Sequence, residues 1–365
     1  MNFESELVNR VIELAVEIQQ IPAPTFEEGE RAEFVRAQFA QAGLSDVEMD
    51  AMGNVYGRWP GGDASPLVVS AHLDTVFPRE TDLLVKREAK RIYGPGIGDN
   101  SMGVAALLGL AWNLRESGAS PRGDIWLAAN TCEEGLGDLR GMKAVVDRFG
   151  ANVTGYLVLE GAALGHVYHR GVGVHRYKIS AKVAGGHAWS DYGQPSAIHE
   201  LAALTSKIAA LVLPKSPRTT LNVGKIVGGT SVNTIAGDAS IELDMRSESP
   251  ASLAELVKSV DALTEAANRP EVRVEAKVIG ARPAGEISSN HPFVKLAVEC
   301  TRAQGMDVSL VGGSTDANVP LSRGIPAAVM GVTRGDGAHT LNEFVETDFV
   351  ERGMSALAEF VEKAF

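Results

Sequence analysis

The stretch Pro66-Leu67-Val68-Val69-Ser70-Ala71-His72-Leu73-Asp74 passes directly from an apolar run to a histidine and a carboxylate. A short apolar run of this kind is consistent with a buried strand. Because residues two apart on a strand point to the same side, we expect His72 and Asp74 to lie together, with Asp74 accepting a hydrogen bond from the imidazole. The end of this predicted strand is therefore a candidate functional position.

Four more acidic or histidine-bearing stretches follow strand-like runs: Asp99 in Gly98-Asp99-Asn100, Glu133-Glu134 after 125–129, Glu160 after 156–159, and His339 shortly after 327–330. In an α/β sheet, side chains at the carboxyl ends of strands converge on one crevice. Carboxylates and histidines gathered there need cations to offset their charge, and a pair of divalent metal ions would do so. The sequence therefore predicts a hydrolase with two zinc ions.

Taken singly, each of these residues has a purely structural explanation. His72 could be a strand-end histidine bonded to its neighbour, Asp99 could cap a helix, and Glu133-Glu134 could be solvated loop carboxylates. Glu160 and His339 could lie at the surface. Their order and common placement favour the functional interpretation.

The composition indicates a soluble protein of two domains. The chain has 365 residues, of which 45% are hydrophobic, and this length exceeds one typical domain. The formal net charge is −12 and no stretch concentrates lysine and arginine, which argues against nucleic acid and anionic membranes as partners. No apolar run approaches the ~20 residues of a membrane span.

The cysteines and the first helical pattern bear on the compartment. Cys132 and Cys300 are the two cysteines and have no metal-ligand spacing, which fits a reducing compartment. Glu6 and Arg10 lie inside a helical pattern, unlike the residues of a signal peptide. We therefore expect a cytoplasmic protein.

Helical and strand-like patterns alternate along the chain as far as Glu160. Apolar residues at three- and four-residue steps predict a helix over 7–21, and further helices are expected over 28–42, 104–112 and 142–149. Alternation of this kind is typical of an α/β fold, with a mainly parallel sheet flanked by helices.

The pattern changes near Gly171. The elements that follow have a β-α-β-β-α-β order, with strands over 174–183, 222–227, 239–246 and 272–279 and helices over 196–213 and 252–268. The first pattern then resumes, with helices over 292–304 and 345–363 and a strand over 327–332. We therefore predict an inserted α+β domain of residues 174–281 in a catalytic domain of residues 1–173 and 282–365.

The five stretches together resemble the M20 metallopeptidases, a family that includes glutamate carboxypeptidase, aminoacylase, succinyl-diaminopimelate desuccinylase and peptidase T. The segments that carry the resemblance are Ser70–Val76, Gly98-Asp99, Glu133–Gly135, Glu160 and Gly337–Thr340. The resemblance extends from the first helix, with Ile21-Pro22-Ala23-Pro24, to the end of the chain. Five motifs in the family's order make it specific.

The resemblance implies two zinc ions, with cobalt or manganese as alternatives, held by five ligands: Asp99 as the bridge, His72 and Glu160 at one ion, and Glu134 and His339 at the other. Glu133 would be the general base that takes a proton from the attacking water and returns it to the departing amine. Asp74 would orient His72. A cis peptide between Asp99 and Asn100 is also implied.

The inserted domain resembles the dimerisation or lid domain of the family at Gly185-Gly186-His187-Ala188. The resemblance implies a homodimer in which His187 donates a hydrogen bond to the substrate carbonyl in the partner's active site. The alternative is a histidine that caps the loop between a strand and a helix. Trp189 stands where relatives often have a small residue, which leaves the shape of the pocket open.

Three further positions are candidates for substrate binding. Arg246 stands where relatives place an arginine that binds the substrate's carboxylate, which a guanidinium grips through two parallel hydrogen bonds. Its alternative is an exposed arginine paired with Glu242 or Asp244. Asn233 and the glycine-rich loop around Gly313 resemble other parts of the same pocket.

The predicted reaction is zinc-dependent hydrolysis of an amide bond, by a hydroxide between the metal ions, in a small N-acyl amino acid or a peptide with a free carboxylate. A glutamate at position 160 resembles the deacylase and carboxypeptidase relatives. Asp99-Asn100-Ser101 lacks the lysine of many relatives and resembles peptidase T, so an aminopeptidase of di- or tripeptides is the alternative. A metal-scaffolded binding protein without catalysis is disfavoured because Glu133 is present.

Overall fold

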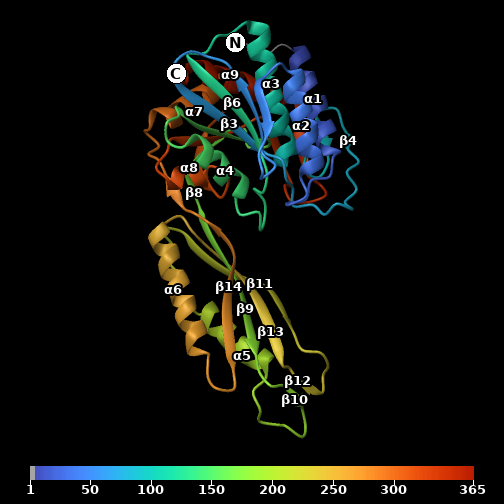
Figure 1. The fold of residues 1–365 in the computed structure, drawn as a ribbon, viewed down its shortest axis with the longest axis vertical. Coiled ribbons are helices and arrows are strands. Elements are labelled where there is room, and N and C mark those ends of the chain that lie inside the picture. Colours follow the sequence, from blue (N-terminus) through green and yellow to red (C-terminus); the bar gives the residue numbers. More distant parts are fainter. Residues whose placement is uncertain (1–4) are drawn as a thin grey trace. The chain divides into compact units, whose positions relative to one another are not determined.

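The computed structural model describes residues 5–365, so the first four residues of the predicted catalytic domain lie outside the described residues. The chain divides into two compact units, which are drawn in Figure 1. Unit 1 combines the chain up to Gly171 with Glu286–Phe365, and unit 2 is Val172–Gly285, compared with 174–281 expected from the sequence.

Within residues 5–365, a nine-stranded mixed sheet forms the centre of unit 1. Its order is β1 (Ser45–Met49), β2 (Val55–Trp59), β6 (Gly123–Asn130), β3 (Ala64–His72), β7 (Gly155–Glu160), β17 (Ala327–Gly331), β8 (His166–Gly171) and β15 (Gly285–Glu286), with β16 (Ser309–Gly313) paired to β8. The central strands from β6 to β17 run parallel, and antiparallel pairs lie toward both edges. The α/β architecture predicted from the sequence is confirmed.

Helices cover both faces of this sheet because neighbouring residues of a strand point to opposite sides (Figure 1). Leu67 and Val69 of β3 pack into one core with α1 (Ser5–Gln19), α2 (Gly29–Gln41), α3 (Met102–Ser117), α7 (Pro292–Ala303) and α9 (Val350–Lys363). Val68 packs into the opposite core with α4 (Arg140–Phe149) and α8 (Asn318–Ser322). None of the helices that the structure describes is both long and apolar enough to cross a membrane.

A second, four-stranded sheet of unit 1 flanks the loop of His339. Its order is β18 (Arg334–Asp336), β19 (Phe344–Glu346), β5 (Arg91–Tyr93) and β4 (Lys86–Arg87). The predicted helix over 345–363 is wrong at its start, because β19 and a 3-10 turn (Thr347–Phe349) precede α9. Val345 is fully buried and pairs with Ile92, so contacts with a distant strand outweigh the local helical pattern.

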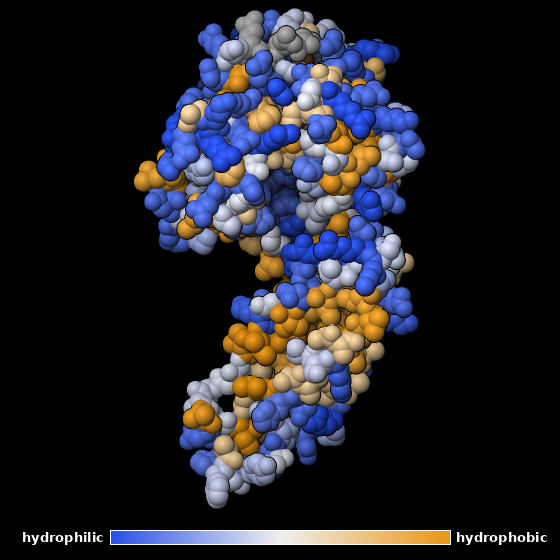
Figure 2. Space-filling view, turned by 180° about the vertical axis from the view of Figure 1, so that it is seen from behind, coloured by the Kyte–Doolittle hydropathy of each residue, from blue (hydrophilic) through white to orange (hydrophobic). Residues whose placement is uncertain are grey.

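Unit 2 is an α+β unit with the predicted β-α-β-β-α-β order. Its main elements are β9 (Gly173–Lys182), α5 (Ala197–Ala209), β11 (Thr219–Gly228), β13 (Asp238–Ser247), α6 (Pro250–Ala266) and β14 (Arg273–Arg282). The antiparallel sheet has the order β11-β13-β9-β14, and a separate pair joins β10 (Gly186–His187) to β12 (Thr234–Ile235). Ile179, Ile241 and Val260 are fully buried between sheet and helices. Figure 2 shows apolar residues gathered on the face of unit 2 that it draws.

Candidate metal centre

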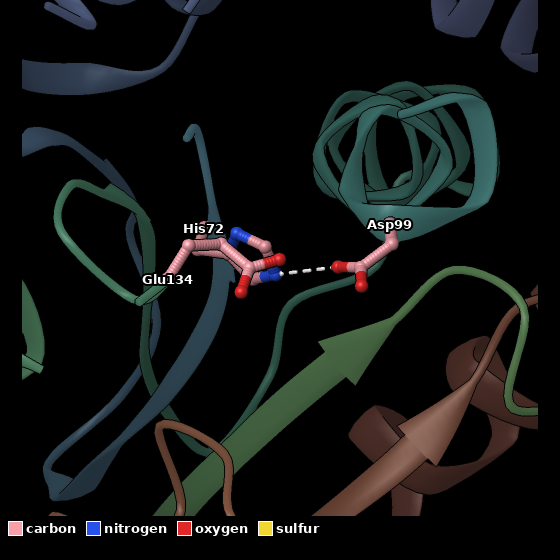
Figure 3. Close-up of side chains that lie close together, drawn as sticks. All are labelled: His72, Asp99 and Glu134. Atoms are coloured by element: carbon pink, nitrogen blue, oxygen red, sulfur yellow. Dashed lines mark ion pairs between the residues drawn. The ribbon is translucent and has the colours of Figure 1, made fainter. Parts of the chain in front are cut away.

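The parallel strands of unit 1 end together and bring the candidate ligands to one place. His72 is the last residue of β3, Glu160 is the last residue of β7, and Glu134 follows β6. Asp99 lies in the irregular turn before α3, and His339 lies between β18 and β19. Figure 3 shows His72, Asp99 and Glu134 pointing toward one another, and their donor atoms all lie within 4.8 Å of one another.

The two carboxylate oxygens of Asp99 face different histidines. Oδ1 lies 3.0 Å from Nε2 of His72, and the same nitrogen lies 3.8 Å from Oε2 of Glu160. Oδ2 lies 3.1 Å from Nε2 of His339, and that nitrogen lies 3.1 Å from Oε1 of Glu134. The structure therefore groups the five side chains as two donor sets that share Asp99.

The spacing of these donors suits divalent metal ions. Two ligand atoms on one tetrahedral zinc ion, at bond lengths of about 2.0–2.1 Å, lie roughly 3.3 Å apart. The observed separations of 3.0–3.8 Å fit this spacing. In addition, Nδ1 of His72 donates to the main-chain carbonyl of Asp74 at 3.0 Å, which leaves Nε2 as the ligand atom.

Without metal ions, protonated imidazoles offset the negative charge of the carboxylates. Burial raises the pKa of Asp99, but hydrogen bonds from His339 and His72 outweigh this effect and hold the pKa below its ordinary value. Burial lowers the pKa of His72, but contacts with carboxylates, Asp74 first among them, hold it well above its ordinary value. Hydrogen bonds to Asp99 and Glu134 raise the pKa of His339 to about 10.

The main-chain carbonyl of Asp74 lies closer to the imidazole of His72 than the carboxylate of Asp74 does, and it is the main group that orients the ring. The carboxylate lies 3.5 Å from Nδ1 of His72, against 3.0 Å for the main-chain carbonyl. The carboxylate instead accepts hydrogen bonds from the backbone N–H groups of Glu133 at 2.9 Å and Glu134 at 2.8 Å. It also accepts a hydrogen bond from the hydroxyl of Thr25 at 2.9 Å. Asp74 therefore also holds the loop of the candidate base, which the sequence did not indicate.

Two further buried side chains hold the same loop. Oδ1 of Asn54 accepts the N–H of Thr131 at 2.9 Å, and Oε1 of Glu28 accepts the N–H of Cys132 at 3.0 Å. Together with the two bonds to Asp74, these contacts provide four consecutive amides with buried side-chain acceptors. Because a buried amide without an acceptor costs about 1–3 kcal/mol, the four contacts favour a single conformation of the loop.

The peptide bond between Asp99 and Asn100 is cis, as the resemblance predicts. Nδ2 of Asn100 donates to the carbonyl of Leu159 at 2.8 Å, and its Oδ1 accepts the N–H of Gly161 at 2.9 Å. The side chain next to the shared carboxylate therefore holds the backbone on both sides of Glu160.

His187 and Asn233 belong to unit 2 and lie beside each other, where the N–H of Ala188 donates to the carbonyl of Asn233 at 3.0 Å. Nδ1 of His187 accepts the N–H groups of Trp189 at 3.2 Å and Ser190 at 3.3 Å. This is the loop-capping arrangement that the sequence left open. It also places the ring proton of a neutral imidazole on Nε2, so that Nε2–H is a donor on an exposed residue.

Arg246 also belongs to unit 2, and it is paired with Asp244, as its alternative explanation predicts. It donates to both oxygens of Asp244, at 2.7 and 3.4 Å, and Asp244 accepts a further bond from Arg176 at 2.8 Å. Two arginines on one carboxylate give this group of three side chains a net positive charge. Gly313 ends β16 in unit 1, where a Cβ atom would lie 2.7 Å from the ring of Tyr168.

Several buried polar residues near the centre were not found from the sequence: Glu28, Arg31, Asn54, Asp316 and Glu343. Burial raises the pKa of Asp316 to about 7 and that of Glu343 to about 7. Burial also lowers the pKa of Arg31 to about 10. Asp316, three residues after Gly313, and Glu343, four residues after His339, lie close to motifs that the sequence analysis singled out, and this proximity was the available signal.

Comparison with known proteins identifies the family. The model of peptidase family M20/M25/M40 matches residues 68–363. The chain therefore belongs to peptidase family M20, and the protein is a metal-dependent hydrolase of the peptidase and amidohydrolase class.

Individual relatives match almost the whole chain. The protein YqjE of Bacillus subtilis is 24% identical, over 97% of this chain and 98% of its own. Carboxypeptidase G2 of Pseudomonas sp. strain RS-16 is 22% identical, over 90% of this chain and 82% of its own. The crystal structure of a tripeptidase from Staphylococcus aureus has the same fold, with a TM-score of 0.82 at 23% identity and 98% coverage of both chains.

Metal binding is expected to release protons. The metal-free protein holds the pKa of His339 at about 10, so its imidazole is protonated at pH 7, whereas a metal ligand must be neutral. A metal ion bound by these histidines would displace a proton from each of them, so its apparent affinity would fall as the pH falls. Calorimetric titration of the metal-free protein at pH 7, in two buffers of different ionisation enthalpy, measures this release. His339→Asn should reduce it, and the absence of any release would contradict ligation by these histidines.

Proposed function

We propose that the protein hydrolyses an amide bond in a small N-acyl amino acid or a short peptide with a free carboxylate, with two divalent metal ions and zinc as the first choice. The observation that carries this proposal is the carboxylate of Asp99, whose oxygens lie 3.0 Å from His72 and 3.1 Å from His339. A carboxylate between two imidazoles, with Glu160 beside one and Glu134 beside the other, suits two ions better than one.

The chemistry divides between the metal ions and the side chains. Bound ions would supply a Lewis acid for the scissile carbonyl and would acidify a water molecule. Glu133, which is 5% exposed and held at its backbone by Asp74, would accept a proton from the attacking water and deliver it to the departing amine. In a homodimer, His187 of one copy would donate its Nε2–H to the oxyanion that develops on the substrate carbonyl in the active site of the other copy.

Arg246 is the proposed recognition group for the substrate's carboxylate. Its pairing with Asp244 orients the guanidinium, and the second arginine, Arg176, leaves this cluster with a net positive charge. The likeness to carboxypeptidase G2 supports a substrate with a free carboxylate. The likeness to a tripeptidase supports short peptides, the substrates of the alternative.

Glu133→Gln is expected to reduce hydrolysis by about 10²–10⁴-fold, because glutamine cannot accept the proton of the attacking water. The measurement is the initial rate on the best substrate of a panel of N-acetyl amino acids, acyl-glutamates, dipeptides and tripeptides. Zinc content should not change, since Glu133 is not a ligand. Glu116→Gln, at an exposed site of α3, is the matched control. Hydrolysis that survives in Glu133→Gln would refute the base, and silence of the wild-type protein with zinc bound would favour a binding protein without catalysis.

Arg246→Ala distinguishes the two substrate classes. Loss of a charged hydrogen-bonded pair, worth about 1.5–3 kcal/mol, should lower kcat/KM roughly 10–100-fold for substrates whose carboxylate the arginine binds. Lys178→Ala, at another exposed cation of the same sheet, should leave kcat/KM unchanged. Cleavage restricted to peptides with a free amino end, and indifferent to Arg246→Ala, would move the protein to the aminopeptidase alternative.

A homodimer through unit 2 completes the proposal. β11 is an edge strand of ten residues that pairs with β13 on one side, and an unpaired strand edge is a template for another chain. Ile226 and Val227 on this strand are 60% and 56% exposed, and Figure 2 shows apolar residues on this unit. A second copy that pairs along this edge would lie beside both side chains, which point to opposite faces of the sheet, and would reduce their exposure.

Sedimentation velocity tests the dimer. The wild-type protein should sediment at twice the chain mass of 38.6 kDa. The double variant Ile226→Asp and Val227→Asp should sediment as a monomer, because charges at the interface oppose its burial. Val212→Asp, at a 97% exposed residue outside the strand, is the control. A monomeric wild-type protein at micromolar concentration would contradict the proposal.

We also infer a cytoplasmic location. Cys132 and Cys300 are free and buried, and unpaired thiols of this kind suit a reducing compartment. Cell fractionation tests the inference, and recovery of the protein outside the cytoplasm would refute it.

A further inference from the structure

The carboxylate of Glu343 lies against the segment that carries Asp99. Oε2 accepts the N–H of Gly96 at 2.8 Å, and Oε1 accepts the N–H groups of Gly98 and Asp99, each at 2.8 Å. Glu343 is 1% exposed. One buried carboxylate therefore binds three backbone amides of a single turn.

The irregular backbone of this turn explains why an outside acceptor is needed. Gly96 has a φ of 77°, and Asp99 has φ −115° and ψ 85°, so neither residue has helical geometry. A buried amide without an acceptor destabilises the conformation that buries it. Glu343 therefore favours this one conformation of the turn over alternatives that would leave the amides unpaired.

Gly98 allows Glu343 to approach the turn. A Cβ atom at position 98 would lie 3.2 Å from Oε1 of Glu343, 3.0 Å from Cβ of Ala162 and 3.1 Å from Cγ1 of Val345. All three separations are shorter than an ordinary van der Waals contact, so a side chain at this position would require these neighbours, Glu343 among them, to shift by a few tenths of an ångström. The contact of Glu343 with the turn therefore depends on the absence of a side chain at position 98.

Glu343 also connects two of the loops that carry candidate ligands. It lies between β18 and β19, four residues after His339, and its main-chain carbonyl accepts the N–H of Gly94 at 2.9 Å. Oδ2 of Asp99 lies 3.1 Å from Nε2 of His339. The relative position of these two side chains therefore depends on the connection that Glu343 makes between their loops.

We propose that Glu343 is a positioning residue of the metal centre, which fixes the turn from Gly96 to Asp99 so that the two oxygens of Asp99 face His72 and His339. The proposal rests on the proposed two-metal function, but it concerns metal affinity and not turnover. This positioning role requires a carboxylate, because both side-chain oxygens must accept hydrogen bonds from backbone N–H groups. A glutamine of the same size offers one acceptor, and in either orientation its NH₂ group faces a backbone N–H.

Glu343→Gln tests the proposal without reference to activity. We expect the affinity for Zn²⁺ and Co²⁺, measured by competition with a chromophoric chelator, to fall about 10–100-fold, as is usual when a group that orients a metal ligand is lost. We also expect the visible absorption spectrum of bound Co²⁺ to change, because Asp99 is displaced. Unchanged affinity and an unchanged spectrum would overturn the proposal.

Glu346→Gln is the matched control. It removes a carboxylate from the same segment, but this carboxylate pairs with Arg91 at 2.9 Å and contacts no amide of the turn. Wild-type affinity for Co²⁺ is expected. An equal loss in Glu346→Gln would overturn the specific role of Glu343.

A second variant decides the case if Glu343→Gln does not fold, as judged by circular dichroism. Gly98→Ala keeps the carboxylate but crowds it together with Ala162 and Val345, so a roughly tenfold or greater loss of affinity in this variant supports the proposal and wild-type affinity overturns it. Wild-type protein that binds metal without hydrolysing any substrate would refute only the proposed reaction. Wild-type protein that binds neither metal would refute the metal centre and this proposal with it.

Discussion

The structure depends on the concentration of negative charge at the carboxyl edge of the parallel strands. β3, β6 and β7 end side by side, and this places His72, Glu134 and Glu160 around the carboxylate of Asp99. Such a cluster in a largely buried place is unstable without positive charge. In the metal-free protein the imidazoles supply that charge as protons, and metal ions at the same positions would replace them. The acid–base behaviour of the cluster and its capacity to bind metal ions therefore have one common cause.

Other carboxylates hold the loops around this cluster, because they accept hydrogen bonds from backbone N–H groups of those loops. Asp74 accepts the N–H groups of Glu133 and Glu134, and Glu28 accepts the preceding N–H, that of Cys132. Glu343 accepts three N–H groups of the turn of Asp99. Bonds of this kind stabilise the buried charge of the acceptor and restrict the loop at the same time. Candidate ligands held in this way would be largely in position before a metal ion binds, which would lower the entropic cost of binding it.

Sequence reasoning selected the candidate ligands because each is attached to a recognisable local pattern. His72 and Glu160 end apolar runs that form strands, and the change of periodicity after Gly171 marked the α+β unit. The same reasoning failed at Val345, where a helical pattern gives way to a strand that pairs with Ile92 far away in the chain. It also missed Glu28 and Glu343, because a buried glutamate has no local signature when its partners are backbone amides.

The sequence by itself determined the fold class, the family and the identity of the candidate ligands, because apolar periodicity and short motifs are properties of neighbouring residues. Only the tertiary structure decided that the oxygens of Asp99 divide between His72 and His339, that Asp74 contacts His72 chiefly through its carbonyl, and that Glu343 holds the turn beside them. These contacts join segments far apart in the chain, and their geometry exists only after the sheet has brought the strand ends together.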